Sequence, residues 1–87
     1  MSKHPKNVEG FNGSLKELAE AIGNMIYNQV AIFIEKLAEN IKKQGECDLA
    51  RGRKKFASAI CAASKKLYEA KDKMDLVWKI CEPYMKD

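Results

Sequence analysis

The chain has 87 residues, 46% of them hydrophobic and 32% charged, and its 16 Lys and Arg against 12 Asp and Glu give a formal net charge of +4. This length fits one small domain, and 3 Cys, 5 Gly and 2 Pro exclude a disulfide-dense scaffold, a collagen-like repeat and a low-complexity linker. The apolar fraction is too high for a disordered chain, so the composition predicts a compact, soluble and mostly helical protein.

The N-terminal segment, residues 1–13, mixes charged residues with one large apolar side chain, Phe11. A secretory signal needs an apolar stretch here, and none is present, so we expect a flexible tail. The longest uncharged run, 21–34, has 14 residues, whereas a membrane span needs ~20 mostly apolar ones. We therefore expect a cytoplasmic protein that has no membrane partner.

The first helix is predicted by Ser14 and Glu17, which have the spacing of a capping box. Apolar residues then recur every three or four positions until a pair of lysines and Gly45 give the ending typical of a helix C-terminus. We therefore expect one helix over 15–44, about 45 Å long at ~1.5 Å per residue. The polar residues 45–48 are expected to form the turn that follows it.

The second helix, 49–82, is predicted by an apolar heptad pattern that begins after Asp48, a suitable N-cap. Steps of four and three reach eleven positions, ten of them apolar or aromatic, which is typical of a left-handed contact between two helices. Because proline cannot occupy a helix interior, Pro83 should end the helix near Cys81 or Glu82. The eleven positions are Leu49, Arg53, Phe56, Ile60, Ala63, Leu67, Ala70, Met74, Val77, Cys81 and Tyr84.

The C-terminal end of this second helix leaves one alternative open. Leu76 and Ile80 project away from the heptad pattern. Either the helix continues and exposes both side chains, or a short third helix, 75–82, folds back over them.

The first helix is apolar over more than the ~100° that one neighbouring helix covers. We therefore expect an all-α, antiparallel long-helix hairpin, forming a single domain over 14–87, that pairs into a four-helix bundle as a homodimer. A monomeric three-helix bundle is the alternative. The expected dimer or partner interface comprises Met25, Ile26, Tyr27, Val30, Ile32, Phe33, Ile34 and Leu37.

The net positive charge is concentrated between residues 49 and 68, which contain six cations and no acid, whereas residues 14–43 sum to zero. Such a basic stripe is able to follow a phosphate backbone, or it is a solvated face whose repulsion is relieved by neighbouring acids. We favour the solvated face over a nucleic-acid partner. The candidate phosphate-contacting residues are Arg51, Lys54, Lys55, Lys65 and Lys66.

The residues that usually carry chemistry are too sparse for a reactive site. Cys47, Cys61 and Cys81 lie 14 and 20 residues apart, and His4 is the only histidine. These spacings suit neither a zinc site nor a redox motif, so we expect reduced thiols, no metal and no cofactor. The chain also lacks a catalytic triad, a Cys/His pair and a phosphate-binding loop, so we do not expect an enzyme.

Surplus apolar surface without a reactive group predicts how the protein acts. We expect a small non-enzymatic helical protein that works through self-association and protein–protein interaction, as an adaptor or a regulator. The alternative is a nucleic-acid-binding regulator that uses the basic stripe on residues 51–66.

Overall fold

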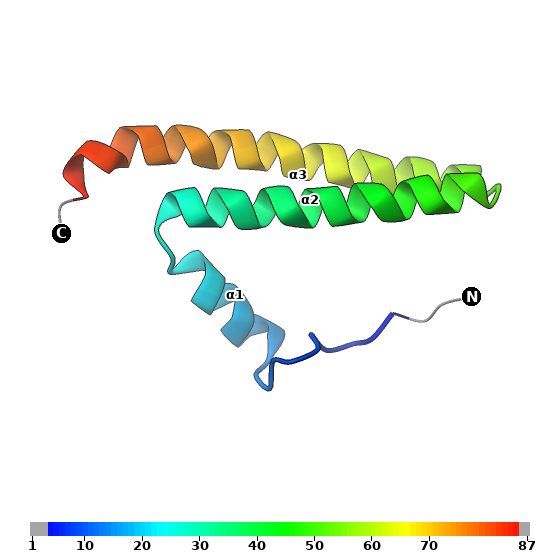
Figure 1. Ribbon diagram of the computed structural model, residues 1–87, viewed down its shortest axis with the longest axis horizontal. Coiled ribbons are helices and arrows are strands. Elements are labelled where there is room, and N and C mark those ends of the chain that lie inside the picture. The colour runs from blue at the N-terminus through cyan, green and yellow to red at the C-terminus, as the bar shows by residue number, and fades with distance from the viewer. Residues whose placement is uncertain (1–3, 86–87) are drawn as a thin grey trace.

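The computed structural model describes residues 4–85, whose regular secondary structure is entirely helical (Figure 1). In chain order the elements are α1, Leu15–Gly23, α2, Tyr27–Ala50, α3, Lys54–Cys81, and a single 3-10 turn η1, Glu82–Tyr84. Helices α2 and α3 lie side by side and antiparallel, and α1 leaves the hairpin at the start of α2 (Figure 1). The prediction of an all-α hairpin is therefore confirmed for this part of the chain.

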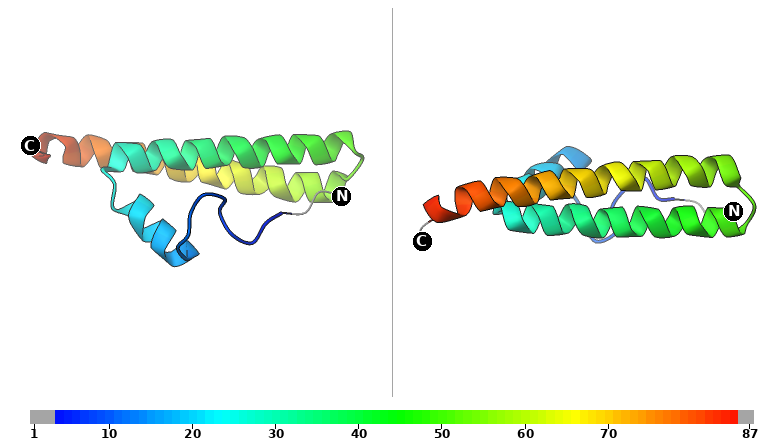
Figure 2. Two further views of the ribbon diagram at one scale, coloured as in Figure 1. Left: turned by 60° about the horizontal axis from the view of Figure 1, so that its bottom comes forward. Right: turned by 90° about the horizontal axis from the view of Figure 1, so that it is seen from above.

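The molecule is long and thin, with principal extents of 50 × 30 × 14 Å. Its radius of gyration is 15.7 Å, whereas a compact chain of this length would have about 12 Å. Its accessible surface is 7247 Å², against about 5,200 Å² for a compact monomer of this mass. The hairpin is one helix thick, and α1 stands out from one side of it at an angle (Figure 2).

Helix α1 begins at the capping box that the sequence predicts. The Glu17 amide donates to Ser14 Oγ at 3.1 Å, and the Ser14 amide donates to Glu17 Oε1 at 2.8 Å. The hydrogen bond from the Ser14 amide, with a contribution from the Ser14 hydroxyl, favours the ionised carboxylate and lowers the pKa of Glu17 below its ordinary 4.5. The predicted helix start is confirmed. Residues 4–13 form no helix or strand, and part of the predicted flexible tail, residues 1–3, lies outside the described residues.

The prediction of one helix over 15–44 is wrong, because the chain breaks between α1 and α2 at residues 24–26. Gly23 and Asn24 are weak helix formers, and Asn24 is the C-cap of α1, where its amide donates to the carbonyl of Glu20 at 3.0 Å. The apolar spacing continues across the break, so the periodicity of the sequence did not reveal it.

The predicted turn at residues 45–48 is also wrong, because this segment belongs to α2. Gly45 is buried against α3, where an added Cβ would lie 2.7 Å from Cys61 Sγ. This glycine therefore allows a close approach of two helices and does not end one. The turn is formed instead by residues 51–53, in which Gly52 has a φ of 81° that favours glycine.

Asp48, the predicted cap of the second helix, instead stabilises the turn from the last part of α2. It is 8% exposed, its carbonyl accepts from the Arg53 amide at 2.9 Å, and Arg53 Nη1 donates to its carboxylate at 3.1 Å. Because these bonds fold residues 51–53 back, α3 starts at Lys54, five residues later than predicted.

Helix α3 is continuous to Cys81, so the alternative of a separate helix over 75–82 is wrong. Leu76 and Ile80 are 51% and 64% exposed, as expected for a continuous helix. Pro83 lies in η1 immediately afterwards, which confirms the predicted end of the helix.

The contact between α2 and α3 is made by small residues, which we call the small-residue seam. On α2 these residues are seven apart, and on α3 Ala57 and Ser64 have the same spacing. Ser64 Oγ donates to the carbonyl of Ala38 at 2.8 Å and so links the two helices in their buried contact. The small-residue seam consists of Ala31, Ala38, Gly45, Ala57 and Ser64.

The predicted heptad pattern is therefore not the centre of the α2–α3 contact. Phe56, Ala63, Ala70 and Val77 are exposed, while Ile60, Leu67, Met74 and Cys81 are half-buried at the margin of the contact. The physical reason is that small side chains let two helices approach closely, and larger ones are then displaced to one side. Tyr84, the last predicted position, is 83% exposed.

Beyond the small-residue seam, an ion pair joins the two helices. Lys71 Nζ lies 2.7 Å from Asp75 Oδ2 on the same helix and 3.9 Å from Glu35 Oε2 on α2. The hydrogen bond to Asp75 and the two negative charges raise the pKa of Lys71 above its ordinary 10.5. Lys71 lies seven residues after Ser64, so the next position in the row of the seam is a lysine with one carboxylate from each helix beside it.

Candidate interaction surface

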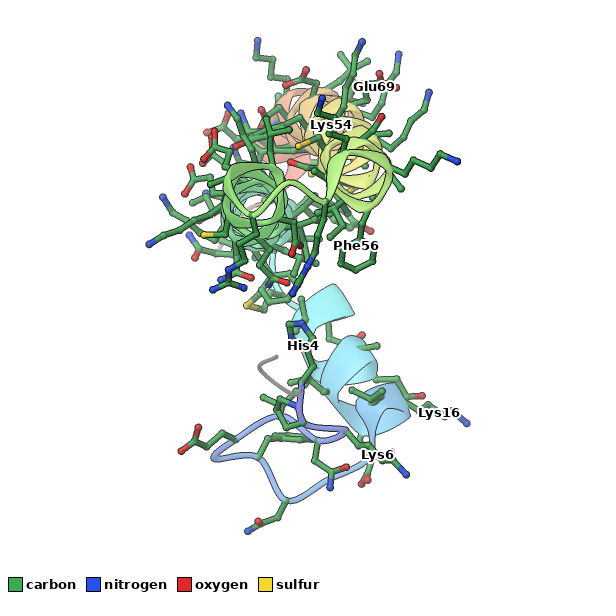
Figure 3. The ribbon with its side chains drawn as sticks, turned by 90° about the vertical axis from the view of Figure 1, so that its right-hand side faces the viewer. His4, Lys6, Lys16, Lys54, Phe56 and Glu69 are labelled. Atoms are coloured by element: carbon green, nitrogen blue, oxygen red, sulfur yellow. The ribbon has the colours of Figure 1, made fainter. Side chains whose placement is uncertain are left out.

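The large apolar side chains displaced from the small-residue seam gather on one side of the hairpin. On both helices these side chains are rotated away from the seam residues in the same direction about the helix axis. Because the two helices are antiparallel, that rotation places both sets on the same side of the hairpin. Figure 3 shows Phe56 pointing toward the side on which α1 lies, whereas Lys54 and Glu69 point away from it. We call this surface the apolar face. It comprises Ile26, Val30, Phe33, Ile34, Leu37 and Ile41 before or in α2, and Phe56, Ile60, Ala63, Leu67, Ala70, Met74 and Val77 in α3.

Much of the apolar face is open to solvent. Phe33 and Leu37 on α2 are 38% and 39% exposed, and Phe56 and Val77 on α3 are 56% and 37% exposed. In a globular domain such side chains would normally fill the core, because burying one of them contributes about 1.5–3 kcal/mol. Their exposure along both helices makes this face the strongest candidate functional surface of the molecule.

Helix α1 covers only a part of the apolar face. A hollow of about 390 Å³ separates its apolar stripe from α2. No residue of α1 is buried, Leu15 is 65% exposed, and no Cα atom of α1 comes within 8 Å of one in α3. The hollow is lined by Leu15, Leu18, Ala19, Ile22 and Gly23 of α1 and by Val30, Phe33 and Ile34 of α2.

The eight predicted interface residues are divided by the fold. Five belong to the apolar face, and Met25 lies in the connection just before it at 38% exposure. Tyr27 starts α2 at 42% exposure, and Ile32, which is 44% exposed, lies on the other side of α2. The role of these eight residues in binding a partner stays a prediction.

The α3 half of the apolar face was not predicted from the sequence, because Phe56, Leu67 and Val77 were expected to lie in the contact inside the hairpin. The available signal was the row of small residues next to them, Ala57 and Ser64, whose heptad spacing matches that of the small residues on α2.

The five predicted phosphate-contacting residues are all exposed, but the helix separates them into two rows. Lys54 and Lys65 are eleven residues apart, close to three turns, and follow the side away from the apolar face. Lys55 and Lys66 form a second row about 100° further around α3. Lys66 also pairs with Glu69 at 3.5 Å, and Arg51 lies in the turn. A single phosphate backbone would thus face only part of this charge.

The three cysteines and His4 are far apart in the sequence and form no common site within residues 4–85. Cys47 is exposed and Cys61 and Cys81 are half-buried, all three as free thiols, and His4 is exposed on the same side of the hairpin as α1 (Figure 3). Between residues 4 and 85, no three His, Cys, Asp or Glu side chains are grouped so that they could hold a metal ion.

The helices of the described part of the chain also fall short of the length and hydrophobicity required to span a membrane.

No protein-family model, curated protein or solved structure matches this chain.

Proposed function

We propose that this protein acts through association and not through catalysis, and that the apolar face is the surface it uses. It pairs with a second copy of itself and with other helical proteins, as a small adaptor or regulator. We place it in the cytoplasm, where its three free thiols would stay reduced.

The observation that carries this proposal is the exposure of large apolar side chains on both helices of the hairpin. The surface exceeds that of a compact monomer of this mass by roughly 2,000 Å², shared among the N-terminal segment, α1 and the apolar face. A stable complex buries about 800 Å² on each partner, so the excess is large enough to supply an interface.

A second copy suits the shape of the hairpin. Stable domains pack two layers of secondary structure around one core, and this hairpin supplies one layer. A hairpin related by a two-fold axis would lay its apolar face on the first and give a four-helix bundle. In that homodimer the small-residue seam would stay within each chain, and the large side chains would form the core between the chains.

The test compares two pairs of substitutions in the full chain. Leu37→Gln with Phe56→Gln makes the apolar face polar, and Ile32→Gln with Leu76→Gln removes two similarly exposed side chains from the opposite side. Light scattering should give twice the chain mass for the wild type and for the control pair, and the chain mass for the first pair. Circular dichroism should show the same helix content in all three.

A monomeric wild type that also binds no helical protein would contradict the proposal. Equal dissociation by both pairs would show that the wrong face has been assigned.

Binding to nucleic acid is the weaker alternative, favoured only by the exposed cations between Arg51 and Lys66. Phosphate binding would weaken steeply between low and moderate salt, because counterions are released when the complex forms. Association through the apolar face would not weaken in this way.

A further inference from the structure

The apolar face is bordered along α3 by charge of one sign. Lys55, Lys66 and Lys73 are eleven and seven residues apart, close to three and two whole turns, so they follow one line along the helix. That line is the outer edge of the apolar face, next to Val77. We call these three residues the lysine edge.

The carboxylates of α2 and α3 lie elsewhere. Those of Asp48, Glu35 and Asp75 are held between the helices or beside Lys71. The remaining four, Glu39, Glu46, Glu69 and Asp72, belong to the side of the hairpin away from the apolar face, and Figure 3 shows Glu69 pointing in that direction.

The lysine edge has little compensation from within the chain. Lys66 reaches Glu69 at 3.5 Å, with 79% and 53% of the two side chains exposed, which is a weak pair in solvent. Lys55 and Lys73 form no ion pair within residues 4–85. On the outer edge of α2, Lys36 is accompanied by the uncharged Gln29 and Asn40. Along α2 and α3, a ligand on the apolar face therefore meets cations or neutral groups at both edges, while Glu17 and Glu20 lie on the projecting α1.

This distribution discriminates between partners. A second copy would bring its own cationic or neutral edges against those of the first, whereas a helix with carboxylates beside its apolar stripe would place opposite charges together. We infer that the preferred occupant of the apolar face is an amphipathic helix of another protein whose apolar stripe is flanked by Asp or Glu. The inference rests on the proposed function and names the partner that the charge selects.

The shape of the site favours a helix over a flat surface. Helix α1 projects from the hairpin on the side of the apolar face (Figures 1 and 3), and a hollow separates it from α2. A bound helix, about 10–12 Å wide, would lie along the α3 part of the face beside α1, whose Leu15 is 65% exposed. A lipid surface would have to bend around α1 to reach Phe33.

The experiment uses two synthetic helical peptides that share one leucine stripe and differ only in their flanking residues, Glu in one and Lys in the other. Binding to the full chain is measured by fluorescence anisotropy at low and moderate salt. The Glu-flanked peptide should bind about tenfold more tightly than the Lys-flanked one at low salt, since a few exposed ion pairs each contribute a little. Added salt should reduce that difference and should strengthen self-association.

Two charge reversals give the matched comparison. Lys55→Glu with Lys73→Glu alters the lysine edge, and Lys54→Glu with Lys65→Glu makes the same change on the opposite side, with one residue of each pair in the first turn of α3. The first pair should abolish the preference for the Glu-flanked peptide, and the second should retain most of it. Circular dichroism checks that both variants remain helical.

The outcomes separate this inference from the proposed function. Equal binding of the two peptides, or equal loss in both variants, would overturn the acidic partner and leave association through the apolar face in place. A homodimer that is insensitive to salt and binds neither peptide would also overturn the acidic partner and support association through the apolar face. Binding to vesicles of anionic lipid without binding to either peptide would overturn the helical partner. A monomer that binds no probe would contradict both proposals.

Discussion

The small-residue seam and the apolar face run along the same two helices and have opposite compositions. In the seam, Ala38 is fully buried and Ala57 and Ser64 are each 2% exposed, whereas Phe56, on the neighbouring face, is 56% exposed. Most domains place large apolar side chains inside and smaller ones at the margins. The inversion shows that this hairpin is held by the close approach of two backbones, while its main apolar surface remains on the outside.

The difference has an energetic consequence. A seam of alanine, glycine and serine removes little side-chain area from water, and burial contributes about 25 cal/mol per Å². Covering the apolar face would add more stabilisation than the seam supplies, since one large side chain contributes about 1.5–3 kcal/mol when it is fully buried. Association should therefore stabilise the fold as well as form the complex.

The largest expected effect comes from giving the seam a large side chain. Ala38→Leu should destabilise the chain by about 2–3 kcal/mol, because Ala38 is 0% exposed and its carbonyl accepts from Ser64. Ala63→Leu is the same change on the apolar face and, at a concentration low enough to keep the chain monomeric, should alter stability by about 0.5 kcal/mol or less. Urea unfolding measures both variants. Similar losses in the two would mean that the distinction between seam and face is wrong.

The ion pairs of Lys71, which lie beyond the seam, should make the stability of the chain depend on alkaline pH. Because the pKa of Lys71 is raised in the folded chain, its contribution is fully present below the ordinary value of 10.5 and is lost as the pH rises through the higher folded value. Chemical unfolding of the wild type should weaken over that range. Lys71→Met should show a smaller pH dependence over that range, because the group whose pKa is raised by folding is removed.

Acid pH should have a smaller effect, a partial loss of helix in α1 beside the apolar face. The pKa of Glu17 is lowered, so its contribution to the cap is present above the ordinary value of 4.5 and is lost as the pH falls through the lower folded value. Backbone chemical shifts of Leu18 should report loss of helix in acid. Glu17→Gln keeps a capping-box residue that does not titrate, so α1 should change less with pH in that variant. Equal acid loss in both would mean that Glu17 is not its cause.

The sequence predicted those features that depend on neighbouring residues and did not predict those that depend on contacts between distant residues. The capping box of Ser14 and Glu17 and the stop at Pro83 depend on a few adjacent residues, and both were predicted correctly. Gly45 was misassigned because a glycine after lysines is typical of a helix end, whereas here it admits Cys61 from α3, a contact between residues sixteen positions apart. Only the tertiary contact distinguishes these two uses of glycine.

The assignment of faces failed for a related reason. The spacing of large apolar residues predicts that Phe56, Leu67 and Val77 contact the neighbouring helix, because such residues usually form the buried face of a helix. Helix pairs that pack through small residues reverse this rule. The relevant pattern, Ala57 against Gly45 and Ser64 against Ala38, carries almost no hydrophobic signal. The residues predicted on α2, such as Phe33 and Leu37, nevertheless belong to the apolar face, because helix α2 has too many apolar residues for one neighbour.

The contact between Gly45 and Cys61 makes the hairpin suited to chemical labelling. The sulfur of the half-buried Cys61 lies 2.7 Å from the point where a side chain at position 45 would begin, so α2 restricts one side of that sulfur while α2 and α3 remain together. Cys47, only two residues along α2 from Gly45, is exposed and open to the same reagent. Cys61 should therefore be modified more slowly than Cys47, and loosening of the contact between α2 and α3 should reduce that difference.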